Sequence, residues 1–484
     1  MHAEAIGRVA DLAWTGRQAQ AIAQATEALA ARGLTAAQNA ELLDLRAESH
    51  MALGDFALAR EDALAMLALA RTPALEALAR CRLAYVQTRQ GGLADAARTA
   101  REAQAAAHKA HQPRLEALAL LRLSEALWRA EDAAAGLAAA EQATERFERL
   151  GDAMWQGRAL WSQACALAAL GREGERERAC RRALALAQQT GDHFGIGGAY
   201  NMLHRDDPDV AAQLAGLHKA LAAFGAGGYA ERQLSIRHNL TITYVEIGLY
   251  RRARRLAQAV AAADAGRGDP FRRAATLDTL ATASVALHRL DDAREYLARH
   301  AALNEHLGSR LLAADTALTA ARIAIAQGDA TGACRHAEAV VAAVADEPET
   351  MRRIVGLTTL GRAWLLAGQG RRARTVSARA VALWRARETP QLAGLGSAVD
   401  VLATHADALR ACGDTAAADA ALAEAYEQLC AGVASLSDAG LRRSWFSRVA
   451  AHRRVVGARR DDALRRGLPR KFHVLCAKQQ KNSE

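Results

Sequence analysis

A turn glycine recurs through this sequence of 484 residues, about once every 40 residues and at the same place in a pattern of small side chains. Each copy stands between two segments whose apolar residues follow the helical period. In most copies a small residue follows five positions later. A repeat of this length predicts a solenoid of helical hairpins, because a hairpin that cannot bury its apolar face alone stacks on the next. The turn glycines are Gly16, Gly54, Gly91, Gly171, Gly248, Gly328, Gly368 and Gly413.

Two members of the glycine series are replaced by other residues. Counting along the repeat places one missing turn at residues 130–132 and another at His288. A longer gap, close to two repeats in length, separates Gly171 from Gly248, and the polar stretch 205–209 lies near its middle. With these degenerate turns included, the sequence predicts about eleven helical hairpins in one elongated, all-α domain.

Residues 357–380 show how one hairpin is built. Apolar and small residues fall on one face of a first helix, and Gly368 ends it, because glycine adopts the left-handed conformation without steric cost. Small residues on the second helix let the two helices approach closely. The first face comprises Leu357, Leu360, Gly361 and Trp364, and the second Ala373, Ser377 and Ala380.

The order Leu360, Gly361, Trp364, Gly368, Ala373 and Ala380 resembles the tetratricopeptide repeat (TPR), and the match covers most of positions 1–430. The repeats are longer than the minimal unit of about 34 residues, and they resemble the long arrays of bacterial regulatory ATPases and transcription activators. The resemblance implies a right-handed superhelix with a concave groove that binds proteins or peptides. The lysine and asparagine clamp by which some such domains hold chaperone C-termini is not reproduced, which disfavours chaperone docking.

In such a superhelix the first helices line the groove, and the resemblance implies that the position six residues before each turn points into it. Arg322 and Arg362 fall there in adjacent repeats, where they could bind a carboxylate or phosphate of a partner. The alternative is that each pairs with a neighbouring acid such as Asp315 or is simply solvated. This position is occupied by Glu48, Tyr85, Glu125, Cys165, Asn201, Ile242, Thr282, Arg322, Arg362 and Asp407. The candidate partner-binding residues are Tyr85 and Trp161 as aromatic anchors, with Asn201, Thr282, Arg322 and Arg362.

The net charge of +10 is concentrated at the C-terminal end. Residues 440–484 contain 13 lysines and arginines and three acids, so the remaining residues are neutral overall. This segment could contact nucleic acid or acidic lipids, although its arginine pairs do not form one helical stripe. Residues 436–470 also resemble the connector that follows the repeats in multidomain bacterial signalling proteins, and a solvated capping helix is a further alternative. We expect a solenoid at 1–430, basic capping or connector helices at 431–470 and a disordered tail at 471–484.

Catalytic and metal-binding signatures are scarce. No phosphate-binding loop is present, His108 and His111 lack a nearby third ligand, and the aspartates at 206–209 fit helix capping better than a calcium loop. The seven cysteines stand singly, no signal peptide is apparent, and no apolar run reaches bilayer length, which favours the cytoplasm.

These observations predict a non-enzymatic protein-interaction scaffold of bacterial signalling or transcriptional regulation, with no cofactor and no metal. Two alternatives remain open. The chain could be the sensory segment of a larger cyclase, kinase or ATPase whose catalytic domain is absent, or it could bind nucleic acid through its basic C-terminal segment.

Overall fold

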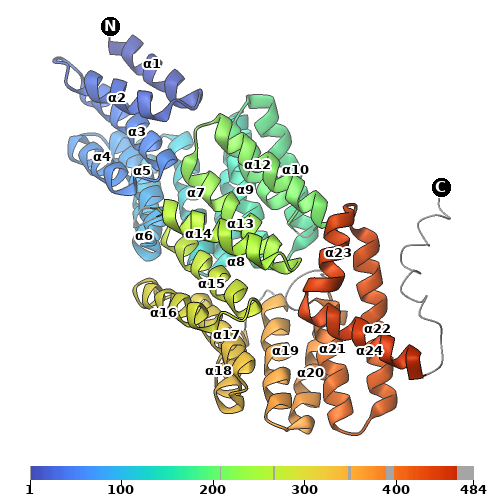
Figure 1. Cartoon of the computed structure of the whole chain (residues 1–484). Coiled ribbons are helices and arrows are strands. Elements are labelled where there is room, and N and C mark those ends of the chain that lie inside the picture. Colours follow the sequence, from blue (N-terminus) through green and yellow to red (C-terminus); the bar gives the residue numbers. More distant parts are fainter. Residues whose placement is uncertain are drawn as a thin grey trace. The chain divides into compact units, whose positions relative to one another are not determined.

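The computed structural model describes residues 2–205, 207, 209–264, 268–346, 350–387 and 397–465, and side chains throughout except at 350 and 462–465. Over these ranges the chain forms 24 helices and no strand, in agreement with the predicted all-α solenoid of hairpins (Figure 1). The helices are α1 (His2–Trp14), α2 (Gln18–Leu29), α3 (Ala36–Leu53), α4 (Phe56–Leu69), α5 (Pro73–Gln90), α6 (Leu93–Lys109), α7 (Pro113–Arg129), α8 (Ala133–Arg149), α9 (Ala153–Ala169), α10 (Glu173–Thr190), α11 (His193–Leu203), α12 (Val210–Ala226), α13 (Ala230–Glu246), α14 (Tyr250–Ala263), α15 (Pro270–Ala286), α16 (Leu290–Leu307), α17 (Arg310–Gln327), α18 (Ala330–Ala343), α19 (Thr350–Leu366), α20 (Gly370–Arg385), α21 (Ala398–Ala411), α22 (Thr415–Ser435), α23 (Ala439–Arg448) and α24 (Ala450–Arg465).

The helices are distributed over two compact units. Unit 1 lies within Met1–Arg205, Ala215–His238 and Val260–Arg273, and unit 2 lies within Asp206–Leu214, Asn239–Ala259 and Ala274–Glu484. The division passes through α12, α13, α14 and α15, so these four helices contribute residues to both units. Each unit is described by itself below.

The turns within hairpins lie where the glycine series predicts them. Gly54 ends α3 with a φ of 90°, and its N–H bonds to the carbonyls of the last helical turn. At the two degenerate turns, Glu131 and His288 adopt φ values of 68° and 58°. Both predicted turns are therefore confirmed, at the cost of placing side chains in a conformation that glycine adopts more easily.

A second glycine series, which the sequence analysis missed, separates successive hairpins. Six of its members have φ values between 62° and 85° and follow the second helix of a hairpin. From Gly151 onward their spacing matches the period seen within hairpins, and this is the signal that could have revealed them. They are Gly33, Gly151, Gly191, Gly228, Gly268 and Gly308.

Helix starts are fixed by side-chain caps. The predicted capping at residues 206–209 is confirmed for Asp209, whose carboxylate accepts a hydrogen bond of 2.9 Å from the Ala211 N–H at the start of α12. Asp152, Asp192 and Asp414 cap α9, α11 and α22 in the same manner. Such caps satisfy donors that the first helical turn leaves unpaired.

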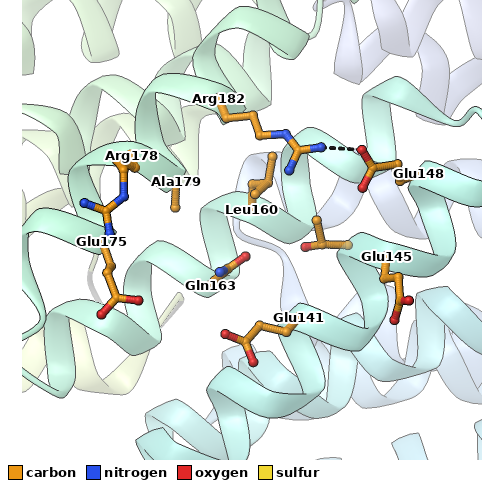
Figure 2. Close-up of a pocket in the computed structure, with 10 residues that line it drawn as sticks. Glu141, Glu145, Glu148, Leu160, Gln163, Glu175, Arg178, Ala179 and Arg182 are labelled. Atoms are coloured by element: carbon orange, nitrogen blue, oxygen red, sulfur yellow. Dashed lines mark hydrogen bonds and ion pairs between the residues drawn. The ribbon is translucent and has the colours of Figure 1, made fainter.

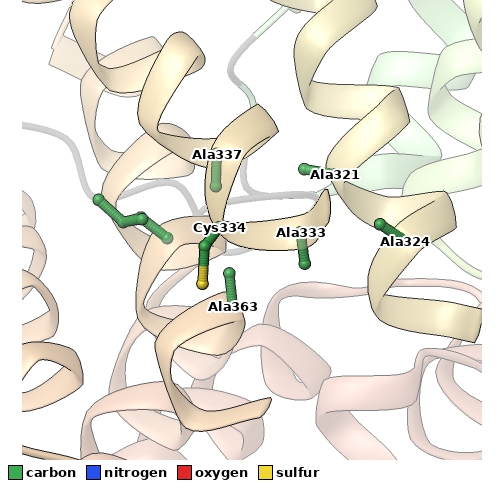
Figure 3. Close-up of a cluster of buried hydrophobic side chains, with 7 residues drawn as sticks. Ala321, Ala324, Ala333, Cys334, Ala337 and Ala363 are labelled. Carbon is green, nitrogen blue, oxygen red and sulfur yellow. The ribbon is translucent and has the colours of Figure 1, made fainter. Parts of the chain in front are cut away.

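Small side chains make up much of the core. Figure 3 shows one cluster of unit 2, in which α17, α18 and α19 meet through five alanines with Cys334 and Leu360. In the hairpin used as the sequence example, Leu357, Leu360, Ala373, Ser377 and Ala380 are all buried, as predicted. Because alanine adds little bulk, the helices can approach closely, and each hairpin covers the apolar face of its neighbour.

In the described part of the chain, none of the helices combines the length and apolarity needed to cross a membrane. The expected disordered tail at 471–484 and residues 466–470 of the expected connector fall outside the described residues. The remainder of that connector forms the end of α22 and the two short helices α23 and α24.

Candidate functional site

The inner-face position of unit 1 is occupied by side chains that already have partners. Arg82 binds Asp44 at 2.7 Å and also pairs with Glu48. Burial alone would raise the pKa of Glu48, but the Arg82 guanidinium outweighs burial and, with other arginines nearby, lowers the pKa to about 2. Glu48 is therefore a structural anion at neutral pH.

The two predicted aromatic anchors of unit 1 are covered by other parts of the same unit. Tyr85 is 6% exposed; the Arg122 guanidinium lies 4.1 Å above its ring and Arg232 donates to its hydroxyl at 3.2 Å. Trp161 is 8% exposed, and its ring lies nearly perpendicular to that of Phe194, with the two ring centroids 5.7 Å apart. Neither ring presents an open face to a partner in this structure, because side chains of neighbouring helices cover them. Asn201 lies half-buried on α11.

Arginines and carboxylates from distant parts of the chain form a buried ion cluster in unit 1. Arg89 contacts Glu231 at 2.5 Å and Asp269 at 3.1 Å. These contacts join α5 to the starts of α13 and α15, which lie far along the sequence. The remaining members are Arg129, which binds Asp269 at 2.6 Å, Arg272, which pairs with Glu231 and binds Asp264 at 2.7 Å, and Arg232, which lies 3.6 Å from Glu231.

The carboxylates of the buried ion cluster are all engaged. Burial would raise the pKa of Glu231, but Arg89 and Arg272 outweigh it and lower the pKa to about 2. The pKa of Asp269 is likewise well below its usual range, where burial is outweighed by Arg129 and Arg89. Each guanidinium of these three arginines has a carboxylate of its own chain, so the cluster holds α13 and α15 against α5 and α7, although the buried Arg129 Nε has no partner.

The sequence analysis did not find this cluster. Arg89 and Arg129 lie one repeat apart and precede their turns by two positions, so they occupy equivalent places in successive repeats. That register is the signal that could have paired the two arginines. No sequence pattern links them to Glu231 and Asp269, which reach them only through the packing of unit 1.

In unit 2 the first helices α15, α17, α19 and α21 carry a row of buried and half-buried polar side chains, which we call the unit 2 inner wall. Thr319 donates to Asp278 at 2.6 Å, Arg322 donates to Thr282 at 3.4 Å, and Arg362 donates to Thr404 at 3.2 Å and pairs with Asp400. These partners lie about one repeat apart and connect neighbouring hairpins. The wall comprises Asp278, Thr282, Thr319, Arg322, Arg362, Asp400, Thr404 and Asp407.

Arg322 differs from the other charged residues of the unit 2 inner wall. Its Nη2 atom is buried and has no hydrogen-bond partner. Burial lowers the pKa of Arg322, and the positive charge of Arg362 lowers it further, although Asp278 and Asp400 oppose the shift. Arg362, by contrast, has its own carboxylate, Asp400, so the alternative of pairing with a neighbouring acid is realised for Arg362.

The six predicted residues are thus distributed over both units. Tyr85, Trp161 and Asn201 belong to unit 1. Tyr85 and Trp161 contact other side chains of the same unit, Arg232 and Phe194 respectively. Thr282, Arg322 and Arg362 lie together on the unit 2 inner wall, on three successive first helices. Which of these residues contact a partner stays a prediction.

A separate open pocket of about 310 Å³ lies between α8, α9 and α10 of unit 1 (Figure 2). Glutamates from α8 and α10 line it, and Arg182 lies at its edge and binds Glu148 at 2.5 Å. Its charged lining is Glu141, Glu145, Glu148, Glu175, Arg178 and Arg182. Among the described residues no group of histidine, cysteine or acidic side chains is arranged to hold a metal ion.

One serine and histidine pair has hydrogen-bond geometry. Ser377 and His405 lie 2.9 Å apart in unit 2. However, Ser377 is 1% exposed and its hydroxyl also donates to the Arg374 carbonyl at 3.2 Å. A buried hydroxyl that substrate cannot reach makes a packing contact and not a nucleophile.

Comparisons with known proteins give distant likenesses to solved structures. No family model and no curated protein matches the sequence. Among solved structures, the apo quorum sensor NprR from B. thuringiensis aligns with a TM-score of 0.46 at 13% identity over 72% of this chain and 97% of its own. A Rap protein complexed with competence and sporulation factor gives 0.41 at 11% over 79% and 97%, and yeast Tom70 gives 0.38 at 12% over 99% of each chain.

The predicted all-α array of repeated helical hairpins is confirmed by the structure itself. At these TM-scores and identities the likeness says nothing of activity or partner.

Proposed function

We propose that this chain is a non-enzymatic scaffold that binds a partner protein or peptide along the unit 2 inner wall, within cytoplasmic bacterial signalling or transcriptional regulation. One observation carries the proposal: the buried Arg322 Nη2 atom lacks a hydrogen-bond partner. A buried donor without a partner costs about 1–3 kcal/mol. A protein retains such a group more readily where a ligand satisfies it.

A carboxylate is the partner group that Arg322 fits best. Charge-assisted hydrogen bonds between guanidinium and carboxylate are among the strongest in proteins. The nearby acids are already engaged, Asp400 by Arg362 and Asp278 by Thr319. Arg322 as a whole is half-buried, so a carboxylate of a partner, from an acidic side chain or a C-terminus, would reach the buried Nη2 once this side chain turns outward next to Thr282.

The test compares wild type with Arg322→Met, which removes the donors but keeps most of the volume. Both proteins are screened against immobilised acidic peptides with free or amidated C-termini. We expect wild type to select peptides with a carboxylate, and Arg322→Met to bind them at least tenfold more weakly while remaining at least as stable to heat. Equal affinities in the two proteins would exclude Arg322 as the partner contact.

The matched control is Arg379→Met on α20. Arg379 is exposed on α20, a second helix of unit 2, and does not belong to the unit 2 inner wall. Its replacement by Met therefore removes the same charge as Arg322→Met without changing the wall. We expect Arg379→Met to select the same peptides as wild type. A loss of binding in both variants would indicate a general effect of net charge on unit 2.

A further inference from the structure

The C-terminal hairpin of unit 2 consists of α23 and α24. The hairpin and the segment before it contact residues near the start of α12 and in the turn between α13 and α14, in the same unit. Ser444 on α23 donates at 2.8 Å to the carbonyl of Ile247, in the turn between α13 and α14. A Cβ on Gly248 in that turn would lie 2.7 Å from the Cβ of Arg448. The segment before α23 makes a similar contact, since the Ser437 N–H donates to Asp209 at 3.3 Å. Segments from the middle and the end of the sequence are thereby brought together.

The second helix of this hairpin lies on the unit 2 inner wall. Arg454 on α24 binds Asp407 on α21 at 2.9 Å. The basic segment that the sequence assigned to nucleic acid or to a cap is thus docked, in its described part, with one arginine paired to a carboxylate of its own chain.

One aromatic side chain anchors the hairpin. Trp445 is 1% exposed, and it fills a notch on α22 that exists because Gly432 has no side chain. An added Cβ at Gly432 would lie 2.8 Å from the Trp445 ring. His452 from α24 completes the contact, donating to the Trp445 carbonyl at 2.9 Å with its ring 4.9 Å from the indole.

The remaining attachments are weak. The Arg454–Asp407 pair is exposed on both sides, at 45% and 38%, and an exposed ion pair contributes little to stability. The α23 helix has only ten residues, and isolated helices of that length do not persist in water. Attachment therefore depends mainly on the fit of Trp445 into the notch at Gly432, on the buried hydrogen bond of Ser444, and on the burial of Ala451 and Val455.

We infer that the surface formed by α21 and α22 is a docking site for a basic helical hairpin with an aromatic anchor, and that α23 and α24 are its resident occupant. A partner hairpin of the same chemistry, with a ring for the Gly432 notch on its first helix and an arginine for Asp407 on its second, would displace the resident hairpin. This inference rests on the proposed use of the unit 2 inner wall and adds its regulation, because the resident hairpin covers the end of that wall.

The test uses the full-length chain and a fluorescent synthetic peptide of residues 437–465. Trp445→Ala releases the resident hairpin but leaves the notch open, whereas Gly432→Ala releases it and fills the notch. Alanine in place of a helical glycine also favours the helix itself, so α22 is not weakened. We expect the peptide to bind Trp445→Ala at least tenfold more tightly than wild type, and not to bind Gly432→Ala.

The control is Gly457→Ala on α24, where a Cβ would meet nothing within 4 Å, and it should behave as wild type. Hydrogen exchange on wild type tests the same idea without any variant: amides of α23 and α24 should exchange at least tenfold faster than those of α21. Equal protection of the two regions, or no binding of the peptide to Trp445→Ala, would overturn the inference. Neither readout involves Arg322, so failure here is separable from failure of the proposed partner contact.

Discussion

At the scale of single residues, charge in this protein separates into satisfied and unsatisfied groups. Glu231 in unit 1 receives two guanidiniums, and its pKa is lowered to about 2. Arg322 in unit 2 has a buried Nη2 atom with no partner. The first arrangement stabilises the fold by pairing each guanidinium with a carboxylate, whereas Arg322 donates to the Thr282 hydroxyl and pairs with no carboxylate in the described part of the chain. This contrast is the reason to place recognition on unit 2.

The satisfied cluster predicts a defined pH dependence. Glu231→Gln should lower the free energy of unfolding by about 3–5 kcal/mol at pH 7, because it breaks a buried ion pair and leaves guanidiniums uncompensated. The folded pKa of Glu231 is below its unfolded value, so its contribution is complete above about pH 4.5 and is lost as the pH falls toward about 2. Urea titrations should therefore show the two proteins converging below pH 4.5. A difference that is constant from pH 7 to pH 3 would contradict this assignment.

At the scale of elements, the repeat is defined by where each helix stops. Most turns use glycine in the left-handed conformation, but Glu131 and His288 adopt it with a side chain. A residue with a Cβ is strained there by roughly 1 kcal/mol. The same strain explains why the series is recognisable in the sequence at all: glycine occupies most copies because the turn requires a positive φ.

His288→Gly should accordingly stabilise the protein, by about 0.5–1 kcal/mol in chemical denaturation. His288 is exposed, so no packing is lost. The mirror-image control is Gly328→Ala, at a turn with φ of 78° and no neighbour within 4 Å of the added Cβ. We expect Gly328→Ala to destabilise by a similar amount. Should both substitutions have the same sign, backbone strain would not be the cause.

At the scale of the whole molecule, the described residues form two compact units, and each is closed by contacts between distant segments. In unit 1 the starts of α13 and α15 bind α5 and α7, and in unit 2 the C-terminal hairpin binds the turn between α13 and α14. Repeat proteins transmit stability mainly between neighbours. A substitution that breaks the long-range contacts of one unit should therefore destabilise that unit and leave the other unchanged.

Hydrogen exchange of Glu231→Gln tests this expectation. We expect faster exchange in α5 and α7, which lose their contact with Glu231 or its neighbours, and unchanged exchange in α19 to α22 of unit 2. Wild type at the same pH provides the reference. Equal acceleration in both sets of helices would show that the two units unfold together.

The sequence by itself determined the hairpin repeat and the turn positions, including those at Glu131 and His288. It also determined which helix faces are lined by small buried residues such as Ala373 and Ala380. These features are local, because helical period and glycine conformation act within a single repeat. Only the tertiary structure decided that Arg89 meets Glu231, that Tyr85 is covered and that Trp445 fits against Gly432. The geometry of those contacts depends on how helices pack and on small rotations between hairpins that accumulate along the array, which no local pattern records.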